Sequence, residues 1–154
     1  MTLTRPKRRI VLVDDHTLFR EGLKTILEME EDIEVVADVE SAEDLVELVW
    51  QTRPDVLLLD IRMPSGNGLD AVPAILRISP RTAVLVLTAC DEKDEHVRAF
   101  KLGAKGVILK DSARQTLMHA IRTVCAGQVW VDPRMANALV EELSHLGPEG
   151  GSGS

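Results

Sequence analysis

The sequence predicts an α/β protein built on a doubly wound, five-stranded parallel sheet. Four short runs are apolar at every position, at residues 10–13, 56–59, 83–87 and 107–109, and a more mixed run lies at 33–37. Fully apolar strands are typical of sheets that helices cover on both faces. Apolar residues at helical spacing separate these runs, and strands that alternate with helices favour a parallel sheet.

The predicted helices follow the strands in order. The first carries Phe19, Leu23, Ile26 and Leu27 on one face. The second follows Ser41 and Asp44, a pair that resembles a capping box, and it ends at Pro54. The others are predicted around residues 67–78, 91–102 and 113–126, and Gly127 is suited to the cap after the last one.

Composition narrows the classes of protein that are possible. The chain has 154 residues and a net charge of −7, which disfavours binding of nucleic acid by this stretch alone. Cys90 and Cys125 have no partner at metal-ligand spacing. The sequence shows neither a leader pattern nor an apolar stretch near 18 residues. We expect a cytoplasmic protein that does not associate with membranes.

Polar side chains stand where four of the five predicted strands end. They are the pair Asp14 and Asp15, then Asp60, Thr88 and Lys110. In open α/β sheets the ligand site lies beyond the carboxyl ends of the strands. The fold therefore predicts that these residues share one pocket, although each alone could be a helix cap, an ordinary strand end or a solvated charge.

The chemistry of this set favours a phosphoryl group. Three carboxylates repel one another near neutral pH unless a cation lies among them, and oxygen ligands favour Mg²⁺ or Mn²⁺. A divalent cation, a lysine and a hydroxyl together suit phosphoryl oxygens. Asp60 follows the most apolar strand, so we expect it to be the central nucleophile. Asp14 and Asp15 would then hold the metal.

Four segments carry a resemblance to a known family. They are Val13-Asp14-Asp15-His16, Asp60-Ile61-Arg62-Met63-Pro64 with Gly68, Leu87-Thr88-Ala89, and Gly103-Ala104-Lys105-Gly106 leading to Lys110. The chain resembles, over about residues 8–126, the receiver domain of two-component response regulators, a domain of flavodoxin-like fold. The same segments are similar to the NarL/FixJ subfamily, whose output domain is of the LuxR type.

The resemblance implies a role for each matched residue. Asp60 would accept a phosphoryl group from a sensor histidine kinase, with Mg²⁺ held by Asp14, Asp15, Asp60 and the main-chain carbonyl of Arg62. Thr88 and Lys110 would bind the phosphoryl oxygens. Arg62, Ala89 and Cys90 would tune the lifetime of the phosphate, and Pro64 and Gly68 would shape the loop after Asp60. The protein would not be an enzyme in the ordinary sense, although it would phosphorylate and slowly dephosphorylate itself.

One position departs from the family pattern. Receivers commonly carry an aromatic residue three positions before the conserved lysine, and this position is Val107. A valine cannot swing a ring between buried and exposed sites. We therefore expect phosphate capture to be intact, while the usual coupling to the surface of the last strand is altered.

The predicted receiver spans residues 1–127. A linker segment at 128–146 and a Gly/Ser-rich tail at 147–154 follow it. Asp132 and Pro133 predict a helix start, and Met135, Leu139, Leu143 and Leu146 form one apolar stripe. The helix could pack on its own domain or on a partner. The tail resembles a cloning remnant. The subfamily resemblance implies a DNA-binding output domain beyond it, and a truncated regulator.

The leading hypothesis is thus a receiver whose phosphorylation favours homodimerisation and controls DNA binding through that missing domain. Alternatives are a stand-alone phosphorelay module and a receiver-like scaffold that works without phosphate. A phosphatase of the haloacid dehalogenase type would also use an aspartate nucleophile. It would need a second aspartate where Arg62 stands, and arginine cannot donate a proton at neutral pH.

Overall fold

The structure, a computed structural model, describes residues 6–63, 66–89 and 91–145. Its main sheet has six parallel strands in the order β2-β1-β3-β6-β7-β8. The strands are β1 (Arg8–Val13), β2 (Ile33–Val39), β3 (Val56–Leu59), β6 (Ala83–Thr88), β7 (Gly106–Leu109) and β8 (Trp130–Val131). The first five are the predicted strands, and a two-stranded hairpin of β4 (Arg62–Met63) and β5 (Gly66–Asn67) follows Asp60.

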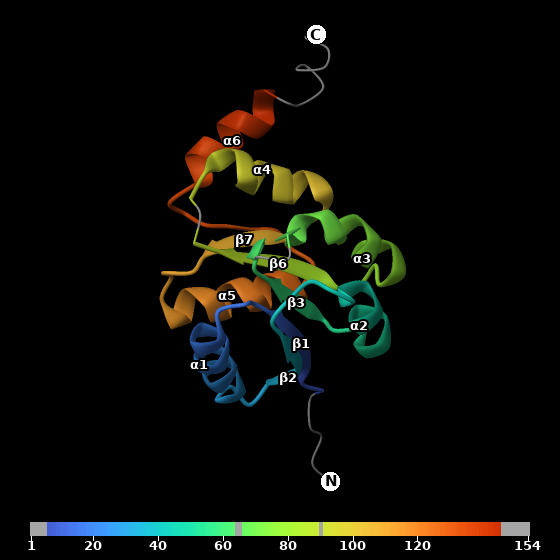
Figure 1. Cartoon of the computed structure of the whole chain (residues 1–154). Helices are drawn as coiled ribbons and strands as arrows, with labels where there is room; N and C mark the ends of the chain where they lie inside the picture. Colours follow the sequence, from blue (N-terminus) through green and yellow to red (C-terminus); the bar gives the residue numbers. More distant parts are fainter. Residues whose placement is uncertain (1–5, 64–65, 90, 146–154) are drawn as a thin grey trace.

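Helices cover both faces of the sheet (Figure 1). They are α1 (Thr17–Glu28), α2 (Leu45–Thr52), α3 (Val72–Ile78) after a 3₁₀ turn at Gly68–Ala71, α4 (Lys93–Leu102), α5 (Arg114–Cys125) and α6 (Ala136–His145). One apolar cluster fills the space beneath α1 and α5, and a second fills the space beneath α2, α3 and α4. Alternate residues of β1, β3 and β6 contribute to the two clusters, so these strands are buried on both faces as their composition predicts.

The sixth strand is an addition to the predicted sheet. β8 pairs in parallel with β7, placing Trp130 beside Gly106 and Val131 beside Val107. The Trp130 amide donates to the Lys105 carbonyl at 2.8 Å. A Cβ atom on Gly106 would lie only 3.0 Å from the Trp130 Cβ atom, so the glycine permits this close approach. Two residues are too few to give a periodic signal in the sequence.

Two predicted helix starts are wrong. Ser41 accepts a bond from the Glu43 amide, while Asp44 adopts a left-handed φ of 58° and makes no side-chain cap, so the capping box does not form. Asp132 also fails to begin a helix, because its side chain accepts the Arg134 amide within a turn and α6 starts only at Ala136. In both cases a short polar side chain stabilises a local turn instead of a helix.

The C-terminal helix packs against its own domain, beside α4 (Figure 1). Leu139 is 1% exposed, and Lys93 of α4 pairs with Glu142 of α6 at 3.4 Å. Leu146 and the tail at 147–154 lie outside the described residues. Among the described helices, none is long and apolar enough to cross a membrane.

A chain of ion pairs joins α5 to the end of α1 and the start of β2. Arg122 contacts Glu30 at 3.0 Å and Asp32 at 3.1 Å, while Arg114 adds a 2.7 Å contact to Glu30. Hydrogen bonds from Arg114 and Arg122 hold the pKa of Glu30 below its ordinary value of 4.5. Arg122 likewise lowers the pKa of Asp32 below 3.8. Several charges sharing partners stabilise a fold more than isolated surface pairs do.

We expect Arg122→Gln to lower the free energy of unfolding near pH 7, and the difference from the unchanged protein to shrink in acid. Carboxylates with depressed pKa values contribute stability above their unfolded pKa, and this contribution is lost as pH falls through the folded pKa. Urea unfolding between pH 7 and pH 3 measures the effect. Arg98→Gln, which removes a single exposed pair with Asp70, is the matched control. An Arg122 deficit that stays constant with pH would contradict the ionic account.

Candidate functional site

The candidate site lies where β1, β3 and β6 end at one edge of the sheet. The register aligns Val13 with Leu59 and Leu59 with Val86, so the residues that follow these strands are neighbours. The Asp60 amide donates to the Val13 carbonyl at 2.9 Å, which extends the pairing to the site itself. This strand pairing brings together residues that are far apart in the sequence.

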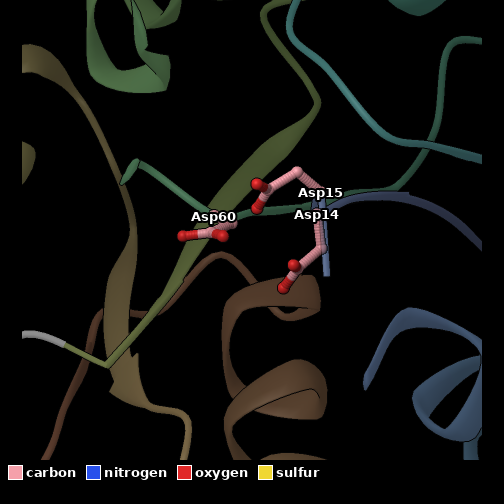
Figure 2. Close-up of side chains that lie close together, drawn as sticks. All are labelled: Asp14, Asp15 and Asp60. Atoms are coloured by element: carbon pink, nitrogen blue, oxygen red, sulfur yellow. The ribbon is translucent and has the colours of Figure 1, made fainter. Parts of the chain in front are cut away.

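Three carboxyl groups converge at this edge, as Figure 2 shows. Each of Asp14, Asp15 and Asp60 offers an oxygen, and these oxygens all lie within 4.8 Å of one another. Asp14 is 1% exposed and Asp60 is 5% exposed, whereas Asp15 faces solvent. One Asp14 oxygen also accepts the His16 amide at 2.8 Å, which fixes that side chain. The cluster has the donor set that hard divalent cations prefer.

Lys110 places its ammonium group against this cluster. Its Nζ atom lies 2.7 Å from Oδ2 of Asp14 and 3.2 Å from Oδ2 of Asp60. Lys110 follows β7, and its amide donates to the Thr88 carbonyl at 2.8 Å, so the lysine and the threonine are held side by side. Thr88 is itself buried at the end of β6. The five predicted pocket residues therefore do meet at one edge.

Burial and charge partners act against each other at Asp60 and at Lys110. Burial raises the pKa of Asp60, and the nearby Asp14 carboxylate adds to this, although Lys110 and the Arg62 amide act in the opposite direction. Burial would lower the pKa of Lys110, but the carboxylates of Asp14 and Asp60 outweigh it and the pKa is raised. Lys110 is therefore a permanent cation at neutral pH, while the charge on Asp60 is held at a cost in free energy.

Main-chain groups of the residues that follow Asp60 lie close to it. The Arg62 amide donates to Oδ1 of Asp60 at 3.2 Å, and Gly68 donates to the Ile61 carbonyl at 3.0 Å. A Cβ atom on Gly68 would lie 3.0 Å from the Asp60 carbonyl oxygen, so glycine suits this close approach. The Arg62 guanidinium points to α4, where it pairs with Glu92 at 3.2 Å and with Glu95 at 3.1 Å.

Two residues of α1 contribute to the site without having been predicted to do so. The Phe19 ring lies beneath Lys110, with 4.7 Å between its centroid and the lysine Nζ atom. Arg20 donates to the Asp14 carbonyl and pairs with Asp38 at 3.2 Å. Phe19 reads in the sequence as one more apolar residue of an amphipathic helix, so periodicity alone could not separate it from the core.

The remaining predicted residues lie farther from the carboxylates or outside the described residues. Val107 is 1% exposed and packs in the cluster beneath α2, α3 and α4. Ala89 is exposed and lines a cleft together with Lys110. Pro64 and Cys90 lie outside the described residues, so their predicted roles stay predictions.

A doubly wound parallel sheet that gathers three carboxylates, a lysine and a threonine at the carboxyl ends of its strands defines a class of phosphate-handling α/β domain. Comparison with known proteins identifies the family. The profile of the response regulator receiver domain matches residues 10–122. The chain belongs to this family.

Relatives and solved structures agree with that assignment. The chain is 41% identical over 140 residues to the transcriptional regulatory protein DegU of Brevibacillus brevis, covering 91% of this chain and 59% of that protein. It is 42% identical to the oxygen regulatory protein NreC of Staphylococcus epidermidis, covering 88% of this chain and 62% of that protein. The chain thus spans about three fifths of the length of these relatives.

Two solved structures place the chain among receivers of the NarL/LuxR type. A LuxR-family response regulator from Aurantimonas sp. has a TM-score of 0.83 at 30% identity, covering 90% of this chain and 99% of that one. The signal receiver domain of the response regulator NarL from Mycobacterium tuberculosis has a TM-score of 0.76 at 35% identity, covering 80% of this chain and all of that one. The predicted flavodoxin-like receiver fold is confirmed.

The raised pKa of Asp60 leads to a prediction about stability. A carboxyl group whose folded pKa is raised destabilises the fold when it is ionised, so removing its charge stabilises the protein above that pKa. We expect Asp60→Asn to raise the free energy of unfolding at pH 7 by about 1 kcal/mol, or a few degrees in Tm. Calorimetry without divalent ions measures the change.

Asp55→Asn is the matched control for that experiment, because Asp55 is an exposed aspartate that accepts the Arg9 amide at 2.8 Å. It should show no gain in Tm. An unchanged or lower Tm for Asp60→Asn would mean that the buried carboxylate is not under electrostatic stress.

Proposed function

We propose that Asp60 accepts a phosphoryl group from a phosphohistidine of a sensor histidine kinase. The observation that carries this proposal is the position of its carboxylate, buried at the end of β3 with Lys110 3.2 Å away and two further carboxylates beside it. A buried carboxylate beside a fixed cation has both a nucleophilic oxygen and a positive charge close to where phosphoryl oxygens must lie.

In the proposed step, an Asp60 oxygen forms a bond to phosphorus while the bond from phosphorus to the histidine nitrogen breaks. The electron pair of that bond stays on the imidazole, and the product is an acyl phosphate. Lys110 and Thr88 would hold the phosphoryl oxygens, the lysine by charge and the threonine by its hydroxyl group. Hydrolysis of the acyl phosphate by water would return Asp60 to its starting state.

The residues fit a divalent metal ion. Asp14, Asp15 and Asp60 supply oxygen donors within 4.8 Å of one another, as Mg²⁺ or Mn²⁺ requires, and the main-chain carbonyl of Arg62 is a further candidate ligand. When bound, such a cation neutralises charge on the phosphoryl oxygens. The Arg62 side chain pairs with Glu92 and Glu95 at α4, so in this proposal only its main chain contributes to the metal site.

At the level of the whole regulator, we propose phosphate-dependent homodimerisation and control of a DNA-binding output domain. The matched relatives carry names of transcriptional and oxygen regulatory proteins, and they extend beyond the length of this chain. A cytoplasmic location is proposed on the same basis. The alternatives are a stand-alone relay and a phosphate-independent scaffold, and the following experiment tests the scaffold.

Incubation with acetyl phosphate and Mg²⁺ should add one phosphoryl group, measured by intact mass. We expect no gain without divalent cations and none in Asp60→Asn, because the nucleophile and the charge neutralisation are both needed. Sizing chromatography of the same samples tests whether phosphorylation drives dimerisation.

Asp70→Asn is the control, since Asp70 is exposed and pairs with Arg98 away from the carboxylate cluster. It should gain the phosphoryl group normally. An equal gain in Asp60→Asn would place the phosphate elsewhere, and no gain in any sample would favour the scaffold.

A further inference from the structure

An arginine of the linker segment is bound directly to the turn that carries Lys110. The Arg134 guanidinium pairs with Asp111 at 2.9 Å and donates to the Ser112 hydroxyl at 3.1 Å. These two acceptors are the residues that immediately follow the phosphate-binding lysine. In the receiver itself, the Ser112 amide donates back to Leu109 at 3.0 Å, so residues 109–112 form one compact turn.

Arg134 is half exposed, and three bonds to Asp132 orient it. Its Nε atom lies 3.2 Å and its Nη2 atom 3.1 Å from the two oxygens of Asp132, and its amide donates to the same carboxylate at 2.9 Å. Asp132 is 2% exposed. Although burial alone would raise the pKa of Asp132, the bonds from Arg134 and from the Leu109 backbone lower it, so the carboxylate stays ionised. A forked guanidinium bound on both sides is a well-defined connector.

The linker segment is fixed on either side of Arg134. Before it, β8 pairs with β7, and the Trp130 indole makes an edge contact with His119 of α5, with ring centroids 5.0 Å apart. After it, Leu139 is buried against the domain and Glu142 pairs with Lys93. Arg134 therefore belongs to a segment that pairs with β7 on one side and packs against α4 on the other.

Arg134 and Lys110 also line the same cleft. This cleft has a volume of about 570 Å³, and Ala89 and Met135 line it as well. Any shift of the turn at 109–112 would move the Asp111 and Ser112 acceptors relative to Arg134. The linker thus contacts the turn that carries Lys110 through Asp111 and Ser112.

We propose that Arg134 is a positioning residue for Lys110, acting through Asp111 and Ser112, and that the linker segment is thereby coupled to phosphoryl binding at Asp60. This inference rests on the proposed function. Arg134 holds the turn with the Lys110 ammonium directed at Asp60, so the docked linker favours capture of the phosphoryl group. Coupling between two sites is reciprocal, so occupation of the site must in turn stabilise the docked linker.

The first arm of the test measures phosphorylation by acetyl phosphate with Mg²⁺, followed by intact mass. We expect Arg134→Gln to slow it about fivefold, within the usual range of coupling between sites. Arg134→Lys should recover part of the rate, since it can reach Asp111 but cannot form the fork with Asp132 and Ser112. Asp111→Asn should slow the reaction too, and the double variant should be no slower than Arg134→Gln alone.

Arg98→Gln removes another arginine pair, at 2.8 Å from Asp70, and is the matched control. It should react at the normal rate. Circular dichroism and Tm of every variant confirm folding. Normal rates for Arg134→Gln in a folded protein, or equal slowing in Arg98→Gln, would overturn the inference. A faster Arg134→Gln would also overturn it, because the linker would then oppose phosphoryl capture.

The second arm tests reciprocity by hydrogen exchange with beryllofluoride and Mg²⁺, a mimic of the phosphorylated site. Amides of residues 128–142 should become more protected in the unchanged protein and should not respond in Arg134→Gln. Exchange that is unaltered or faster in the unchanged protein contradicts the coupling. If the unchanged protein is not phosphorylated by acetyl phosphate and does not respond to beryllofluoride, the proposed function is wrong. The unchanged protein alone gives this result, so it is distinct from a failure of the Arg134 inference.

Discussion

The contact between Lys110 and the buried carboxylates of Asp14 and Asp60 is the constraint around which the site is organised. Parallel strands that are apolar on both faces carry their terminal residues into a region of low dielectric, where like charges repel strongly. Burial disfavours the charged form of Asp60 and raises its pKa, and a nearby cation offsets part of this cost. Lys110 supplies that cation, with its Nζ atom 2.7 Å from Oδ2 of Asp14 and 3.2 Å from Oδ2 of Asp60. The position of Lys110 depends on the turn that follows β7.

The residues of the site could be predicted from the sequence, whereas some of the residues around it could not. Asp60, Thr88 and Lys110 each follow an apolar run, and strand pairing fixes where such residues meet. The Phe19 ring centroid lies 4.7 Å from the Lys110 Nζ atom, and Arg134 lies 2.9 Å from Asp111. Both contacts join side chains of different elements, and hydrophobic periodicity does not predict such contacts. The two helix starts differ from the prediction for a related reason: at Asp44 and at Asp132 a local turn forms in place of a side-chain cap.

Strand β7, which lies between β6 and β8, shows how a local departure from the family pattern is accommodated. Val107 is buried within the cluster beneath α2, α3 and α4 and pairs with Val131 of β8, so the strand is covered on its face and along its edge. Gly106 allows a close approach by Trp130, whose Cβ atom lies 3.0 Å from the position that a Cβ atom on residue 106 would take. A branched aliphatic residue suits such a covered strand, because it fills its space without a polar tip that would need a partner.

Stability and function pull in opposite directions at Asp60. The raised pKa of Asp60 means that folding holds its negative charge in an environment that disfavours the charge. A fold can maintain such stress only if its surroundings are rigid. Around the turn at residues 109–112, strand pairing supports one side, and the Arg134 guanidinium, bound to Ser112 and Asp132, supports the other. Because Arg134 belongs to the linker, whatever displaces the linker must also alter how well the turn presents Lys110 to Asp60.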